Sequence, residues 1–127
     1  MAEPSNLRRY AAQARSSETF GRVLCSARDQ HFISDGPPAN GCPGEATSPA
    51  ELFLSGVAAC GVELVQVLAK DAGLPLRGVR VNIEGVQDRD RPVRPDVSLF
   101  NSVRLQFELS GLSDEQAKEL IERFRRR

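Results

Sequence analysis

A cysteine at the centre of an apolar stretch is the residue in this sequence best suited to redox or nucleophilic chemistry. Cys60 ends the small-residue triplet Ala58-Ala59-Cys60, and Glu51 lies nine residues before it. A thiol reacts as its thiolate, which a nearby cation such as an arginine guanidinium favours. Taken alone, a cysteine in a buried helix is more often a small packing residue. The residues alone leave both interpretations open.

The other cysteines and the one histidine do not form a metal-binding pattern. Cys25, Cys42 and Cys60 are not spaced as in zinc sites, and His31 has no second ligand near it in the sequence. We therefore expect no metal and no cofactor. Cys25 alternates with Leu24 in a strand pattern, which favours a core position, whereas Cys42 lies in a Gly/Pro-rich loop that could leave it exposed and oxidisable.

The segment around Cys60 has the signals of one long helix. Ser48 is a suitable N-cap, and Glu51 three residues later completes a capping box. Gly73 marks the other end. At ~1.5 Å per residue such a helix is about 36 Å long. Residues 52–62 carry no charge, so the pattern predicts a central helix that is enclosed on several sides.

Helix geometry separates the two candidate site residues. Nine residues along a helix correspond to about 180° of rotation and about 13 Å of rise, so Glu51 and Cys60 cannot meet within one straight helix. A single layer of strands would cover one side of the helix, and a second copy of the chain is the natural cover for the other. We therefore expect a homodimer. If Glu51 and Cys60 serve one site, Glu51 reaches it from the partner subunit.

The rest of the chain predicts strands and a second helix around the long one. Alternating or β-branched stretches precede and follow it, and Ser113 with Gln116 begins a shorter helix with a capping box. This order predicts an α+β fold, an antiparallel sheet packed on the long helix, as a single domain over residues 1–127. The predicted strands are YAAQARSS at 10–17, GRVLCSA at 21–27, HFISD at 31–35, LRGVRVNIEGV at 76–86 and SVRLQFELSG at 102–111.

Composition excludes several function classes. Hydrophobic residues make up 40% and charged residues 27% of the 127 positions, and the formal net charge is zero. We therefore expect no nucleic-acid partner and no membrane-surface binding. The long apolar helix contains Glu51, Glu63 and Lys70, which favours a core helix over a membrane span. The polar N-terminal segment does not resemble a signal peptide, so we expect a cytoplasmic protein.

The stretch SDGPPANGCPGEATSPAELFLSGVAACG at 34–61 resembles the signature region of the OsmC/Ohr family, the osmotically inducible protein C and organic hydroperoxide resistance proteins. Asp35, Pro49, Glu51, Leu52 and the triplet ending at Cys60 match its pattern. Residues 74–88 are similar to the strand after the family's helix, and residues 110–124 to its second helix.

The resemblance implies an intertwined homodimer with thiol peroxidase activity. Cys60 would be the peroxidatic cysteine, which attacks the O–O bond of a hydroperoxide and becomes a sulfenic acid. An arginine from the N-terminal strands, Arg22 in preference to Arg15, would hold the thiolate, and Glu51 would orient that arginine. An apolar site would favour organic hydroperoxides, and an external thiol would act as reductant.

Three departures from the family pattern affect this interpretation. Ala50, not a glutamate, directly follows the proline, with Glu51 next. The arginine is not fixed by any motif. The family's resolving cysteine lies in a Cys-Pro segment after the second helix, whereas this sequence ends at Arg127, so we expect that segment to be lacking. Cys42 is then an alternative resolving thiol.

Two other functions stay open: a non-catalytic OsmC-like binding or stress protein, and a thiol redox sensor.

Overall fold

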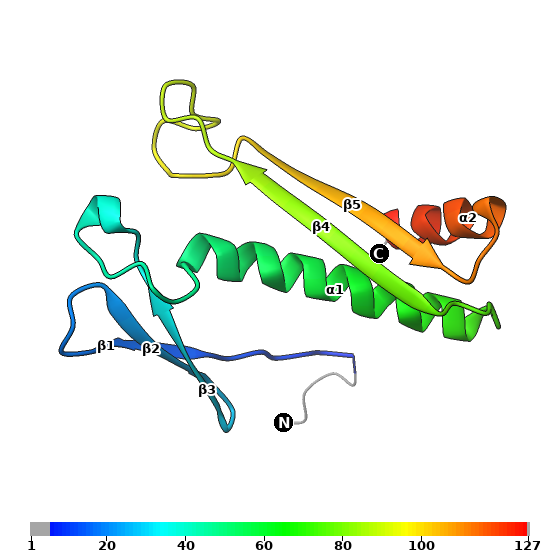
Figure 1. Ribbon diagram of the computed structural model, residues 1–127, viewed down its shortest axis with the longest axis horizontal. Helices are drawn as coiled ribbons and strands as arrows, with labels where there is room; N and C mark the ends of the chain where they lie inside the picture. Colours follow the sequence, from blue (N-terminus) through cyan, green and yellow to red (C-terminus); the bar gives the residue numbers. More distant parts are fainter. Residues whose placement is uncertain (1–5, 127) are drawn as a thin grey trace. The chain divides into compact units, whose positions relative to one another are not determined.

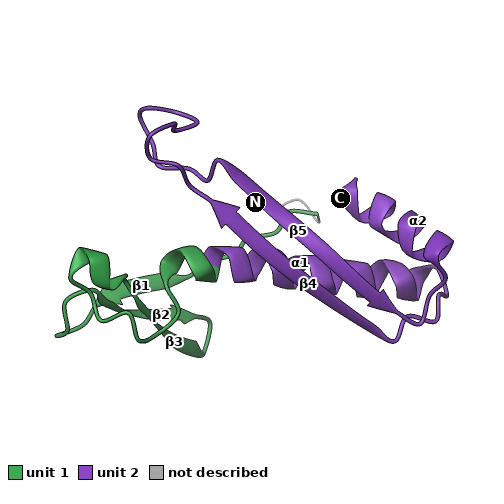
Figure 2. Ribbon diagram, turned by 45° about the horizontal axis from the view of Figure 1, so that its top comes forward, with its two compact units in different colours: residues 1–52 green, residues 53–127 purple. Residues whose placement is uncertain are grey.

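The computed structural model describes residues 6–126 and contains five strands and two α-helices (Figure 1). Together with the antiparallel pairing of the strands, they confirm the α+β class. The chain divides into two compact units, unit 1 with residues 1–52 and unit 2 with residues 53–127 (Figure 2). In chain order the elements are β1 (Gln13–Ser16), β2 (Arg22–Ala27), β3 (Gln30–Asp35), the 3₁₀ turn η1 (Pro38–Asn40), α1 (Pro49–Asp71), β4 (Gly78–Val86), β5 (Ser102–Ser110) and α2 (Asp114–Arg125).

Unit 1 is a three-stranded antiparallel sheet with β2 in the middle. A tight turn at Arg28 and Asp29 joins β2 to β3, and Arg28 has a φ of 54° there. Because this turn pairs Ala27 with Gln30, Arg22 at the far end of β2 lies directly opposite Asp35. The register of the hairpin therefore brings a cation and an anion together across the strands.

Unit 1 has almost no apolar core. Among its described residues, the fully buried side chains are those of Ser34 and Asp35. By contrast, Phe20 is 75% exposed and Ile33 is 48% exposed. Hydrogen bonds of the sheet ladder and of these two buried polar residues therefore hold unit 1 together, because apolar burial contributes little.

Unit 2 has the hydrophobic core. The β4–β5 hairpin runs along α1, and α2 packs beside its later turns (Figure 1). The rings of Phe107 and Phe124 meet edge to face at 5.0 Å between centroids, and both lie within about 4 Å of where a Cβ on Gly61 would be. The buried centre comprises Val65, Ala69 and Leu120, with partly buried Leu68, Leu74, Leu76, Val79, Phe107, Leu109, Leu112, Ile121 and Phe124 around it.

The predicted helix signals are confirmed. Glu51 Oε1 accepts a hydrogen bond from the Ser48 backbone N–H at 2.9 Å, and Ser48 Oγ accepts one from the Glu51 N–H at 3.2 Å. Ser113 and Gln116 form the same reciprocal capping box at α2. Gly73 follows α1 with a φ of +66°, the left-handed conformation expected at a helix end.

One expectation about packing needs correction. We predicted one sheet, whereas the described chain forms two separate antiparallel sheets, because each set of strands pairs locally on its own side of α1 in the sequence. Within the single chain, the buried residues of α1 are Gly61, Val65 and Ala69. These are spaced four residues apart and form one face. Enclosure of the other face by a second copy stays a prediction, as does the single-domain assignment.

By length and composition, α1 is the one helix among the described residues that could cross a membrane. This is weak evidence, because core helices of soluble proteins pass the same test. The expectation that the chain has no membrane partner therefore stays a prediction.

Candidate functional site

Arg22 and Asp35 form a two-point ion pair across β2 and β3. Arg22 Nε donates to Asp35 Oδ1 at 2.9 Å, and Arg22 Nη2 donates to Asp35 Oδ2, also at 2.9 Å. The Asp35 side chain has no exposed surface, whereas the Arg22 side chain is 29% exposed. This parallel geometry is the strongest that a guanidinium and a carboxylate can make, and it fixes the plane of the guanidinium.

Asp35 also binds the loop that leads to α1. Its Oδ2 accepts hydrogen bonds from the backbone N–H groups of Glu45 at 3.0 Å and Ala46 at 2.9 Å. The hydrogen bonds from Arg22 chiefly hold the pKa of the Asp35 carboxyl well below its usual range, and the two backbone donors add to the effect. In turn, hydrogen bonds to Asp35 and then Glu45 raise the pKa of Arg22. Both groups are therefore charged.

Glu45 supplies a second carboxylate to the same guanidinium. Its Oε1 accepts from Arg22 Nη2 at 2.9 Å. Unlike Asp35, its side chain is 76% exposed. One side of Arg22 is thus held by a buried anion and the other by an anion that water can reach.

Glu51 lies at the start of α1, and its carboxylate is engaged in the capping box with Ser48. The hydrogen bond from the Ser48 backbone chiefly lowers the pKa of Glu51. Among the hydrogen bonds of the described residues, none joins Glu51 to Arg22. The carboxylates that contact Arg22 within the chain are those of Asp35 and Glu45.

Cys60 lies on the face of α1 opposite its buried face. At 100° per residue, Cys60 is about 140° from Val65, the centre of the buried face. The Cys60 side chain is accordingly exposed in the single chain. We expected it to be enclosed between two subunits, and that enclosure stays a prediction. It belongs to what we call the exposed stripe of α1, which comprises Phe53, Gly56, Cys60, Glu63 and Val67. Cys60 lies in unit 2 and Arg22 in unit 1, so a contact between them stays a prediction.

A pocket of about 330 Å³ opens beside the first residue of the exposed stripe. Phe53, Leu99 and Phe100 give it apolar walls, and Gln87 and Ser98 add polar groups. The rings of Phe53 and Phe100 stack at 5.9 Å between centroids. Phe53 precedes Cys60 by seven residues, so the two lie on one side of α1, about 10.5 Å apart along its axis.

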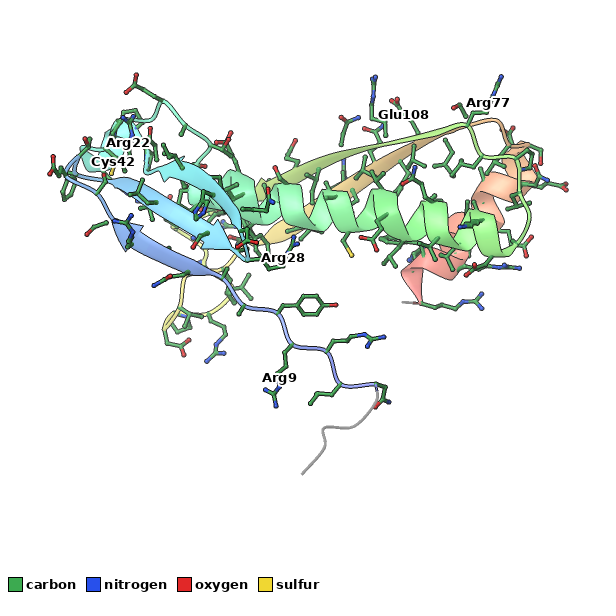
Figure 3. All side chains as sticks on the ribbon, turned by 90° about the horizontal axis from the view of Figure 1, so that it is seen from below. Arg9, Arg22, Arg28, Cys42, Arg77 and Glu108 are labelled. Atoms are coloured by element: carbon green, nitrogen blue, oxygen red, sulfur yellow. The ribbon has the colours of Figure 1, made fainter. Side chains whose placement is uncertain are left out.

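Cys42 is partly buried and packs beside the Arg22 pair (Figure 3). Its Sγ lies against Gly21 and Gly36, the residues directly before Arg22 and directly after Asp35. This packing gives Cys42 a structural role that its loop position did not predict. Its part as a resolving thiol stays a prediction.

The remaining candidates occupy the sheet of unit 1. Arg15 on β1 pairs with Leu24, so it lies on the same sheet face as Arg22. Cys25 is partly buried, and His31 is exposed. Within residues 6–126 no three His, Cys, Asp or Glu side chains come together as a metal site would require.

A family model described as OsmC-like protein matches residues 42–127, more than half of the chain. The chain belongs to the OsmC-like family. Among the similar solved structures is an OsmC-like protein from Mycoplasma pneumoniae, with a TM-score of 0.77 and 20% identity, over 91% of this chain and 79% of that one. An organic hydroperoxide resistance protein from Elizabethkingia anophelis has a TM-score of 0.73 and 19% identity, over 94% of this chain and 82% of that one.

A third structure, the organic hydroperoxide resistance protein OsmC from Legionella pneumophila, has a TM-score of 0.70 and 24% identity, over 93% of this chain and 82% of that one. At such identities the similarity shows that this chain has the OsmC-like fold. No protein with a curated description matches the sequence. The predicted family and fold are thus confirmed.

The sequence of this OsmC-like protein did not lead us to two residues of the site, Asp35 and Glu45. Asp35 was named only as a residue of the stretch that resembles the family signature, and its pairing with Arg22 was not predicted. The signal was present, because a two-residue turn at 28–29 places residue 22 opposite residue 35. Glu45 was missed altogether, since its position depends on the path of an irregular loop.

Proposed function

We propose that this OsmC-like protein is a thiol-dependent peroxidase that reduces organic hydroperoxides in the cytoplasm as part of peroxide defence. The observation that carries the proposal is the alignment of an exposed thiol, Cys60, with the apolar pocket beside Phe53 on one side of α1. Similar structures named organic hydroperoxide resistance proteins support the same class of substrate.

The proposed reaction begins with the Cys60 thiolate. Its sulfur attacks one peroxide oxygen, the O–O bond breaks, and the alkoxide that leaves takes up a proton to become the alcohol. Cys60 is then a sulfenic acid. A thiol reductant condenses with it, releasing water and forming a mixed disulfide, and a second thiol frees Cys60. The thiol that condenses with the sulfenic acid belongs to an external dithiol, with Cys42 as the alternative within the chain. If Cys42 condenses, the product is a Cys42–Cys60 disulfide, which an external dithiol must then reduce to free Cys60.

Arg22 is the proposed cation of the site, because a guanidinium near a thiol favours the thiolate. Arg22 stays positively charged, since the hydrogen bonds to Asp35 and Glu45 raise its pKa. Glu51 would reach the site from a second copy of the chain, because helix geometry separates it from Cys60 within one copy.

A homodimer is the proposed assembly. The exposed stripe of α1 repeats at intervals of three and four residues, the spacing with which one helix packs on another. Gly56 and Cys60 are small enough to let a second helix approach closely. Unit 1 also leaves Phe20, Phe32 and Ile33 exposed, which a partner would cover.

The test is hydroperoxide consumption in the presence of a dithiol, with Cys60→Ser compared with the wild type. We expect the wild type to consume cumene hydroperoxide faster than hydrogen peroxide, and Cys60→Ser to fall to the background rate. Cys25→Ser is the matched control and should keep its activity. Equal rates for the wild type and Cys60→Ser would exclude the proposal. A Cys42–Cys60 disulfide formed without turnover would instead indicate a redox sensor.

A further inference from the structure

We propose that Asp35 is the positioning residue of Arg22 and that Glu45 is its second, releasable partner. The inference rests on the proposed function only in that Arg22 serves Cys60. The geometry gives this task to two carboxylates of the same chain, whereas the carboxylate of Glu51 is held at the start of α1.

Asp35 has the properties of a fixed anchor. It is fully buried, and its two oxygens accept four hydrogen bonds, two from Arg22 and one each from the N–H groups of Glu45 and Ala46. All four donors are N–H groups that point at the carboxylate. An amide in its place would set an NH₂ donor against some of them, so only the anion satisfies the arrangement.

Asp35 also ties the position of Arg22 to that of the loop before α1. The oxygen that accepts from Arg22 Nη2, Oδ2, is the one that accepts from the backbone of residues 45 and 46. On the same strand end, the Asp35 N–H and Ser34 Oγ both donate to the carbonyl oxygen of Thr47. Asp35 therefore positions both the Arg22 guanidinium and the loop that leads to Ser48 at the start of α1.

Glu45 differs from Asp35 in the way a releasable partner should. It makes one side-chain contact with Arg22, and its side chain is mostly in water. Exposed ion pairs contribute little, so this contact can open at small cost while Asp35 keeps the guanidinium in place. When Glu45 moves away, Nη2 regains a free direction for another anion, such as a thiolate or a peroxide oxygen.

The first experiment observes Arg22 directly and does not depend on activity. In ¹⁵N-labelled protein, the Arg22 Nε–H signal is assigned by its loss in Arg22→Lys. We expect slow hydrogen exchange at this proton in the wild type and in Glu51→Gln. In Asp35→Asn the protection should fall by about tenfold or more, since the amide is uncharged and sets an NH₂ donor against N–H groups that the carboxylate accepts. Unchanged protection in Asp35→Asn, or lost protection in Glu51→Gln, would overturn the proposal.

The second experiment asks whether Asp35 acts through Arg22. Second-order rates with cumene hydroperoxide are measured for Asp35→Asn, Arg22→Lys and the double variant. Each single variant should lose about tenfold or more, and the second substitution should then cost less than about twofold, because coupled residues are not additive. Losses that multiply would mean that Asp35 acts independently of Arg22.

Two further variants keep the result interpretable. Glu45→Gln is at the surface and should fold and retain the protected Arg22 signal. A loss of the signal in Glu45→Gln would show that Glu45, not Asp35, is the anchor. Where Asp35→Asn does not fold, Asp35→Glu keeps the charge but lengthens the side chain, and an unshifted Arg22 signal there would equally contradict the proposal. A wild type without peroxidase activity would disprove the proposed function, while the exchange data would still decide this inference.

Discussion

The sulfur of Cys42 occupies the space that a side chain on Gly36 would need. A Cβ atom on Gly36 would lie 2.6 Å from Cys42 Sγ and 3.1 Å from Cys42 Cβ. Gly36 also donates its N–H to the carbonyl oxygen of Gly21 at 2.9 Å, which limits how far it can shift. The loop that carries Cys42 and the end of β3 are therefore fitted to each other.

From this contact we predict that Gly36→Ala destabilises the protein by about 1–3 kcal/mol, as overpacking does. In a Cys42→Ala background the same substitution should cost clearly less, because Sγ is removed. Urea unfolding of the four proteins of this double-mutant cycle measures the difference. Equal costs in the two backgrounds would show that the sulfur is not the obstacle.

A second prediction concerns pH. The pKa of Asp35 is lower in the folded chain than its ordinary value near 4, so the folded state favours the anion. Its contribution to stability is complete above that ordinary value and is lost as pH falls toward the lowered one. We expect the wild type to be more stable than Asp35→Asn at pH 7, and the gap to narrow below about pH 4. Unfolding free energies at a series of pH values measure it, and a constant gap would refute the assignment.

The core of unit 2 gives a third prediction. Leu120 is 1% exposed and packs with Val65 and Ala69. Leu120→Ala should reduce the unfolding free energy by about 2–5 kcal/mol, from lost burial and the cavity left behind. Val97→Ala, in the exposed β4–β5 connection, is the control and should change it by less than about 0.5 kcal/mol. A similar loss for both variants would mean that the packing described for α2 is not the main source of stability.

A fourth prediction links the pocket to substrate choice. If Phe53 holds the organic part of a hydroperoxide, Phe53→Ala should raise KM for cumene hydroperoxide by about tenfold, as for lost apolar contacts of this size. The rate with hydrogen peroxide, which has no organic part, should stay within about twofold. Tyr10→Ala, which removes a ring that is 91% exposed and lies outside the strands, serves as the comparison. A parallel fall with both substrates would instead indicate damage to Cys60 or to the fold.

A fifth prediction tests the proposed homodimer. Val67 belongs to the exposed stripe of α1 and is 38% exposed in the single chain. Val67→Asp would place a charge in the proposed interface, which is costly unless the charge is paired. Sedimentation at micromolar concentration should show a dimer for the wild type and for Val97→Asp, and a shift toward monomer for Val67→Asp. A wild type that sediments as a monomer would exclude the assembly.

Local signals in the sequence predicted the elements well, because each depends on neighbours in the chain. The capping boxes at Ser48 and Ser113 are examples, since the partners are three residues apart. The sequence did not show which side of α1 the chain covers. That depends on where β5 and α2 pack, and residues such as Phe107 and Phe124 come from distant segments.

The candidate site divides in the same way. Cys60 was recognisable from its segment, and the pairing of Arg22 with Asp35 followed from a register that could have been counted from the turn. The contact of Glu45 with Arg22 could not have been predicted, since it depends on how the loop after η1 folds back toward β2. Side-chain alternation says nothing about such a loop.

The pair of Arg22 and Asp35 has a consequence for how the first hairpin assembles. Sliding β2 by one residue against β3 would turn Arg22 to the opposite face and leave a carboxylate sealed in the interior with no cation. An unpaired buried carboxylate would destabilise such a misaligned hairpin, although few buried apolar side chains would oppose the shift. The ion pair therefore specifies the register of β2 and β3 in a unit that has little apolar packing to do so.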